Sequence, residues 1–175
     1  MKNYVDNIRK AEIILGTAKK YKTNLSIIKS TIKSNDQRQK TLFNRVKKIL
    51  KNKINNKKIT FLGVTFKPNT DDMREATSLK MIKYLSKKGA FINYNDPSGS
   101  KKILDNIKKV KFHKSIMSAC NKTDLIIIHT EWNEYKQLNF KKLVNKNNFK
   151  VYDMRNLYSP AKMQKLKIKY FGIGR

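Results

Sequence analysis

The sequence predicts an α/β protein in which a long-helix segment precedes a doubly wound, largely parallel sheet. Three observations support this fold class. Apolar residues recur at helical spacing over about the first 50 residues, and short β-branched runs then alternate with amphipathic stretches. Residues 125–128 are four consecutive aliphatics, which indicates a strand buried on both faces, as in a parallel sheet. Strands that alternate with helices are joined by right-handed crossovers into such a sheet.

Two helices are expected in the amino-terminal part. The first covers about residues 6–21, and the second runs from a cap near residues 23–24 to about residue 50. The polar run at residues 35–37 would either break the second helix or form its polar face. Residues 51–58 are rich in lysine and asparagine and are expected to be a linker.

Strands and helices are expected to alternate after this linker. Each strand is a short β-branched or aromatic run, Gly89 ends one helix, and Pro160 begins another. The expected strands are residues 59–64, 90–94, 110–112, 124–129, 149–153 and 168–172. The expected helices are residues 77–88, 101–108, 115–121, 140–145 and 160–165. Because ligands bind beyond the carboxyl ends of parallel strands, we expect the loops after Val64, Tyr94, His129 and Asp153 to line the functional edge.

Length and composition exclude several classes of protein. A chain of 175 residues is too short for a large two-domain enzyme. The mean hydropathy is −0.68, and the longest apolar run falls far short of the ~18–20 residues that cross a bilayer. The first residues also lack the apolar core of a signal peptide, so we expect a soluble, cytoplasmic protein that binds no membrane. With Cys120 as the only cysteine and His113 and His129 as the only histidines, neither a disulfide nor a metal site is expected.

The basic charge has two interpretations. The chain carries 41 Lys+Arg against 12 Asp+Glu, a net charge of +29, which raises the question of nucleic-acid binding. Nearly all of this charge is lysine, often beside asparagine or isoleucine, and these residues share A/T-rich codons. We therefore expect no nucleic-acid partner and attribute the excess mainly to codon bias. A basic nucleic-acid-binding module remains the alternative, and the base composition of the source genome would discriminate between the two.

The loop after the first expected strand carries the most informative residues. Lys67 and Arg74 place two cations at the ligand-binding edge, where they suit a phosphate or a diphosphate. Asp71 and Asp72 stand just before a helix, where carboxylates can cap free backbone N–H groups. The alternative is that both cations merely pair with these carboxylates and with Glu75 on the surface.

Several ordered motifs resemble one family. Residues 66–75, F-K-P-N-T-D-D-M-R-E, are similar to the signature of the carboxyl-terminal domain of the UDP-glucose 6-dehydrogenases, in the UDP-glucose/GDP-mannose dehydrogenase family. The resemblance continues through residues 94–97, 130–134 and 153–158, and upstream it includes residues 35–38 of the family's long central helix. It is nearly continuous from about Glu12 to Arg175.

The resemblance implies roles for individual residues. Phe66 and Lys67 would contact a UDP-sugar, Arg155 would contact this substrate across a dimer, and Arg74 would reach the pyrophosphate of the cofactor NAD. Residues 58–175 would form a Rossmann-like UDP-sugar-binding domain, and residues 1–57 would form a helical segment that makes a homodimer. The family oxidises UDP-glucose to UDP-glucuronate with NAD, for polysaccharide biosynthesis.

Other parts of the family pattern do not occur in this sequence. It contains no GxGxxG-type loop, and the family's nucleophilic cysteine would fall near Asp6. Cys120, on a short helix before a buried strand, is expected to be packing material, so no catalytic residue is assigned. We therefore expect a carboxyl-terminal portion of such an enzyme that is inactive alone. An amino-terminal partner chain could complete it, or it could act as a regulatory partner of a full-length dehydrogenase.

Overall fold

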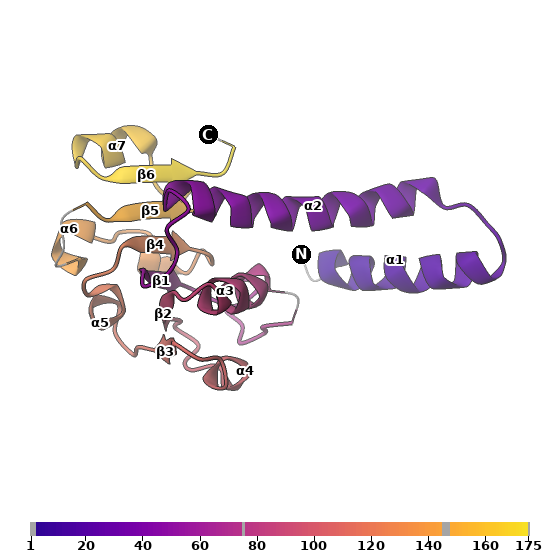
Figure 1. The fold of residues 1–175 in the computed structure, drawn as a ribbon, viewed down its shortest axis with the longest axis horizontal. Helices are drawn as coiled ribbons and strands as arrows, with labels where there is room; N and C mark the ends of the chain where they lie inside the picture. Colours follow the sequence, from indigo (N-terminus) through magenta and orange to yellow (C-terminus); the bar gives the residue numbers. More distant parts are fainter. Residues whose placement is uncertain (1–2, 75, 145–147, 175) are drawn as a thin grey trace. The chain divides into compact units, whose positions relative to one another are not determined.

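The computed structural model describes residues 3–74, 76–144 and 148–174 (Figure 1). The chain divides into two compact units, Met1–Arg45 and Val46–Arg175. Val46, Ile49 and Ile54 are buried and belong to the second unit. No helix in the described part of the chain is both long enough and apolar enough to cross a membrane.

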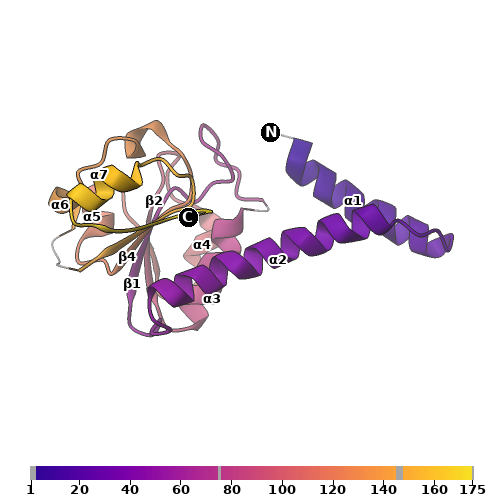
Figure 2. The ribbon, with the colours of Figure 1, turned by 90° about the horizontal axis from the view of Figure 1, so that it is seen from above.

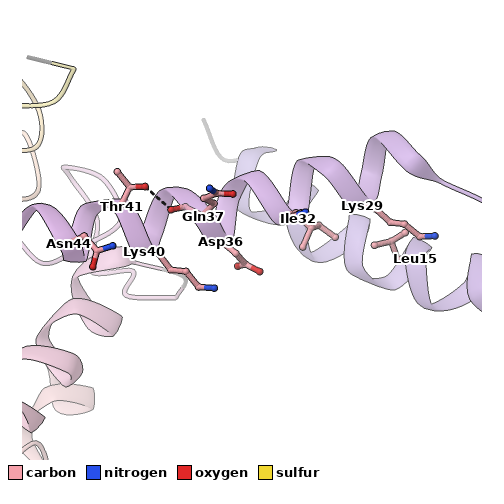
Figure 3. Close-up of a pocket in the computed structure, with 9 residues that line it drawn as sticks. Leu15, Lys29, Ile32, Asp36, Gln37, Lys40, Thr41 and Asn44 are labelled. Atoms are coloured by element: carbon pink, nitrogen blue, oxygen red, sulfur yellow. Dashed lines mark hydrogen bonds between the residues drawn. The ribbon is translucent and has the colours of Figure 1, made fainter.

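The first unit is a pair of helices, α1 (Asn3–Lys20) and most of α2 (Ser26–Ile49). Both expected helices are confirmed to within a few residues. The helix α2 continues through residues 35–37 without a break, so this run forms a polar face. Asp36 and Gln37 line a pocket between the two helices, together with Leu15 of α1 and Ile32 of α2 (Figure 3).

The second unit is built on a six-stranded sheet in which all neighbouring strands are parallel. The strands are β1 (Lys58–Leu62), β2 (Phe91–Asn95), β3 (Val110–Phe112), β4 (Leu125–Ile128), β5 (Lys150–Asp153) and β6 (Lys169–Gly172). Their spatial order is β3-β2-β1-β4-β5-β6, so the chain runs outward from β1 in one direction and from β4 in the other. This order confirms the predicted doubly wound, Rossmann-like class.

Helices cover both faces of this sheet. They are α3 (Thr77–Lys87), α4 (Lys102–Asp105), α5 (Ile116–Cys120), α6 (Phe140–Leu143) and α7 (Pro160–Lys165). The first two lie on one face and the other three on the opposite face (Figures 1 and 2). Each expected helix and strand is present, with ends shifted by up to a few residues. A 3₁₀ turn at Asn133–Tyr135 was not expected, and residue 145, the predicted end of α6, lies outside the described residues.

The core is centred on the inner strands. All four residues of β4 are fully buried, as its aliphatic run predicts, and Phe61 of β1 lies between Tyr94 of β2 and Ile127 of β4 in register. The order of the strands reverses between β1 and β4. In sheets of this kind the crevice beyond the carboxyl ends of these two strands is where ligands bind.

Candidate functional site

Four loops meet at the carboxyl edge of the sheet. Leu62 is in register with Asn95 of β2 and with Ile128 of β4, and Ile128 is in register with Asp153 of β5. The loops that follow these four strands therefore begin side by side, as the sequence predicts.

A close contact joins the loops after β1 and β4. Gly63 has a φ of +75°, and a Cβ at this position would lie 2.5 Å from the Thr130 Cβ. Glycine is required here because other residues rarely adopt this conformation and because no side chain would fit. The Thr130 hydroxyl also donates a hydrogen bond of 2.6 Å to the Thr65 carbonyl oxygen.

Asp96, directly after β2, holds the turn after β1. Its Oδ2 atom accepts hydrogen bonds from the backbone N–H groups of Val64, at 2.8 Å, and Thr65, at 3.3 Å. Lys101, itself buried, lies 4.0 Å from Asp96 and donates to the Ser98 hydroxyl at 2.7 Å. In dinucleotide-binding sheets the N–H groups of this turn face a pyrophosphate. In this protein these N–H groups instead donate hydrogen bonds to the Asp96 carboxylate of the same chain.

His129, directly after β4, closes the start of α3. Its Nε2 atom accepts the backbone N–H of Ser78 at 3.1 Å, so the ring proton is on Nδ1 and is donated to the Thr130 hydroxyl at 3.1 Å. Burial, assisted by the nearby charge of Arg155, lowers the His129 pKa to about 3, so the imidazole is neutral. The expectation that Asp72 caps this helix is not met, because Asp72 accepts the N–H of Arg74 instead.

Arg155 is fixed by three neighbours. Its Nε donates to the His129 carbonyl oxygen at 2.6 Å, and its Nη2 donates to the Phe66 carbonyl oxygen at 3.4 Å. Glu131 Oε2 lies 2.9 Å from the same Nε, but forms no hydrogen bond with it, so this contact is an ion pair. The guanidinium remains partly accessible, with its side chain 33% exposed.

The turn that carries Arg155 is organised by Asp153 at the end of β5. One carboxylate oxygen accepts the N–H of Arg155 at 2.9 Å. The other accepts the N–H of Tyr158 at 3.2 Å and the hydroxyl of Tyr170 at 2.9 Å. Because Asp153 is fully buried, these bonds supply the polar partners that water cannot.

Arg74 is bound within its own loop. Its Nε and Nη2 donate to the two oxygens of Asp72 at 3.0 and 2.9 Å, and these bonds are the main cause of the lowered Asp72 pKa. The Arg74 side chain is 86% exposed. This pair matches the surface-pairing alternative for Arg74. For Lys67, no hydrogen bond or ion pair is formed with any side chain in the part of the chain that the structure describes, and Glu75 lies outside that part.

The structure thus brings Phe66 and Arg155 of one chain together, and Lys67 follows Phe66 in the same loop, whereas the resemblance implies a contact of Arg155 across a dimer. Arg74 is paired with Asp72. Sequence reasoning missed the roles of His129, Asp96 and Lys101, although a polar residue directly after a buried strand was a usable signal for the first two.

Cys120 is unsuited to nucleophilic chemistry. Its side chain is fully buried on α5, and burial raises its thiol pKa to about 12. The thiol therefore stays protonated at neutral pH.

Comparisons with known proteins agree with these observations. The family model described as the UDP binding domain of the UDP-glucose/GDP-mannose dehydrogenase family matches residues 60–160. A UDP-glucose 6-dehydrogenase from Rickettsia felis is 34% identical over 155 residues, which cover 85% of this chain and 34% of that protein. A UDP-glucose 6-dehydrogenase from Rhizobium meliloti is 32% identical over 165 residues, which cover 93% and 37%.

Solved structures show the same fold. A UDP-glucose dehydrogenase from Pyrobaculum islandicum superposes with a TM-score of 0.74 at 20% identity, over 94% of this chain and 36% of that one. An NDP-N-acetyl-D-galactosaminuronic acid dehydrogenase from Methanosarcina mazei gives 0.74 at 24% identity, over 87% and 32%. The chain spans about a third of the length of the relatives it matches. It belongs to the UDP-glucose/GDP-mannose dehydrogenase family and contains the family's UDP-binding domain.

Proposed function

We propose that the carboxyl edge of residues 58–175 binds a UDP-sugar, UDP-glucose or its oxidised product UDP-glucuronate, with Phe66, Lys67 and Arg155 as ligands. The observation that carries this proposal is Arg155, which three neighbours hold beside Phe66 while its guanidinium stays partly exposed. A fixed guanidinium recognises phosphate oxygens in a defined direction. Lys67 adds a second positive charge in the adjacent loop.

We further propose that this edge serves the NAD-dependent oxidation of UDP-glucose to UDP-glucuronate. The names of the bacterial relatives support this reaction. The 175 residues are proposed to bind but not to oxidise the sugar, because the buried Cys120 thiol is no nucleophile. The remaining chemistry would come from an NAD-binding domain with a nucleophilic cysteine, and residues 1–57 would make a homodimer.

The edge described above does not fit NAD as its own dinucleotide site. The backbone N–H groups that would face the pyrophosphate are bonded to Asp96 and His129. Arg74 is proposed to contact NAD bound mainly by another domain. Its position on the surface, held by Asp72, would suit such a contact.

Calorimetric titration of the 175-residue chain with UDP tests the binding proposal. We expect Lys67→Ala and Arg155→Ala each to weaken binding about 10- to 100-fold, because a hydrogen bond to a charged group contributes about 1.5–3 kcal/mol. Lys87→Ala removes an exposed lysine at the end of α3 and should leave the affinity unchanged. Equal losses in all three variants would mean that UDP responds only to net charge, and the proposed site would be wrong.

A second measurement tests the proposed lack of turnover. NADH formation from UDP-glucose should be undetectable with the 175-residue chain alone. Robust turnover would overturn the proposal that the chain needs another domain for oxidation.

A further inference from the structure

We propose that His129 is a positioning residue of the nucleotide-sugar edge, which fixes the loop after β1 at both ends and sets the direction of the Arg155 guanidinium. This role depends on the proposed function, because it takes Arg155 to be a ligand of the UDP-sugar.

The imidazole joins two ends of one loop. Its Nε2 accepts the N–H of Ser78 in the first turn of α3, which follows the loop. Its Nδ1–H donates to the Thr130 hydroxyl, which in turn donates to the carbonyl oxygen of Thr65, just before Phe66. One ring therefore ties the chain immediately before Phe66 to the helix that begins after Arg74.

The same residue directs Arg155 through its backbone. The His129 carbonyl, which accepts Arg155 Nε at 2.6 Å, belongs to the peptide unit that joins His129 to Thr130. The ring of His129 and the hydroxyl of Thr130 hold this unit from both sides, and its own N–H, that of Thr130, donates to the Leu62 carbonyl oxygen at 3.4 Å. A rotation of this peptide would turn the acceptor away from Arg155.

The imidazole also closes the helix start to ligands. The amino-terminal N–H groups of a helix ordinarily attract phosphate. At α3 the cap residue Ala76 contributes no side-chain bond, and His129 takes the N–H of Ser78 from within the core. A diphosphate would therefore be bound by the side chains of Lys67 and Arg155 rather than by the start of the helix. This arrangement connects a buried residue to the binding of an exposed ligand.

Four variants separate positioning from general stability. His129→Leu removes both ring bonds, whereas His129→Gln retains an acceptor near the position of Nε2. Thr130→Val removes the hydroxyl that links the His129 ring to the Thr65 carbonyl. This variant tests the same role if His129→Leu does not fold. Thr60→Val is the matched control, because it deletes a buried hydrogen bond of 2.7 Å from the Thr60 hydroxyl in β1 to the Ala119 carbonyl oxygen in α5, away from the carboxyl edge.

UDP titrations of these variants give the first readout. We expect a five- to twenty-fold loss of affinity in His129→Leu and Thr130→Val, recovery to within about threefold in His129→Gln, and no loss in Thr60→Val. With Arg155→Ala as the starting protein, His129→Leu should weaken binding less than it does in the unaltered chain, because the part of its effect that acts through Arg155 is already lost. An undiminished loss in that background, or an equal loss in Thr60→Val, would overturn the role of His129.

The NMR signal of the Arg155 Nε–H in the ligand-free chain is the second readout. Its exchange with solvent should speed up in His129→Leu and Thr130→Val but not in Thr60→Val. If the unaltered chain does not bind UDP, the proposed function fails, and this measurement still decides the positioning role. Unchanged exchange in both His129→Leu and Thr130→Val would refute it.

Discussion

Replacing Gly63 by alanine tests how tightly the turn after β1 is held against β4. Two penalties are expected. A non-glycine residue at φ +75° costs about 1–2 kcal/mol. The new Cβ would lie 2.5 Å from Thr130 Cβ, whereas ordinary contacts begin at 3.4 Å, so the loops must separate by roughly 0.9 Å. Overpacking of this kind adds about 1–3 kcal/mol, for a total loss of about 2–5 kcal/mol.

Gly99→Ala is the matched control for this substitution. Gly99 has a similar φ of +90°, but nothing lies within 4 Å of the position that its new Cβ would take, so only the backbone penalty of about 1–2 kcal/mol applies. Urea unfolding of both variants measures the difference. Gly63→Ala should also weaken UDP binding, because it displaces Thr130. Equal destabilisation by the two substitutions would refute the close contact between Gly63 and Thr130.

Three further predictions concern buried groups. Asp153→Asn should lower the free energy of unfolding by about 1.5–3 kcal/mol and weaken UDP binding, because an amide cannot accept hydrogen bonds from all the N–H and O–H groups that face this carboxylate. Urea unfolding and UDP titration measure the two effects, and the prediction is contradicted if both are unchanged. Cys120, with a pKa of about 12, should resist iodoacetamide at pH 8 in the folded chain and react once unfolded; mass spectrometry showing equal rates would disprove its burial. The pKa of His129 is lowered from 6.5 to about 3 in the folded chain. Between these two pH values the imidazole is protonated in the unfolded chain but neutral in the folded chain. The free energy of unfolding should therefore fall as the pH drops below 6.5, by up to about 1.4 kcal/mol per pH unit. Comparing urea unfolding at pH 7 and pH 5 should show a smaller fall in His129→Gln, and an equal fall would contradict the buried neutral imidazole.

Most of the fold could be predicted because its signals are local. The aliphatic run of β4, the stop at Gly89 and the start at Pro160 each report on a single element. The order of the strands is not local, but alternation of strands and helices leaves few right-handed arrangements. The turn at Asn133–Tyr135 lacked such a signal, because its one buried residue, Tyr135, is held by hydrogen bonds to Asn95 at the end of β2, which is distant in sequence.

The site was only partly predictable for the same reason. Phe66, Lys67 and Arg155 stand in recognisable motifs at the ends of strands, so their common edge follows from the topology. The partners that fix them are separated in sequence: His129 bonds Ser78, and Arg155 bonds Phe66. Which nitrogen of His129 accepts, and whether Asp72 bonds a helix or Arg74, depends on loop geometry that residue spacing does not determine.

The internally occupied N–H groups of the turn after β1 affect how this domain can evolve. A phosphate site made of main-chain donors survives most substitutions, because every residue except proline supplies the same N–H group. Here those donors serve Asp96, and His129 takes the N–H of Ser78 at the start of α3, so on the proposed function the choice of ligand falls to a few replaceable side chains at the rim. On the proposed function, selection could then change which sugar nucleotide binds by altering the rim, while the strands and the buried bonds beneath it stay the same.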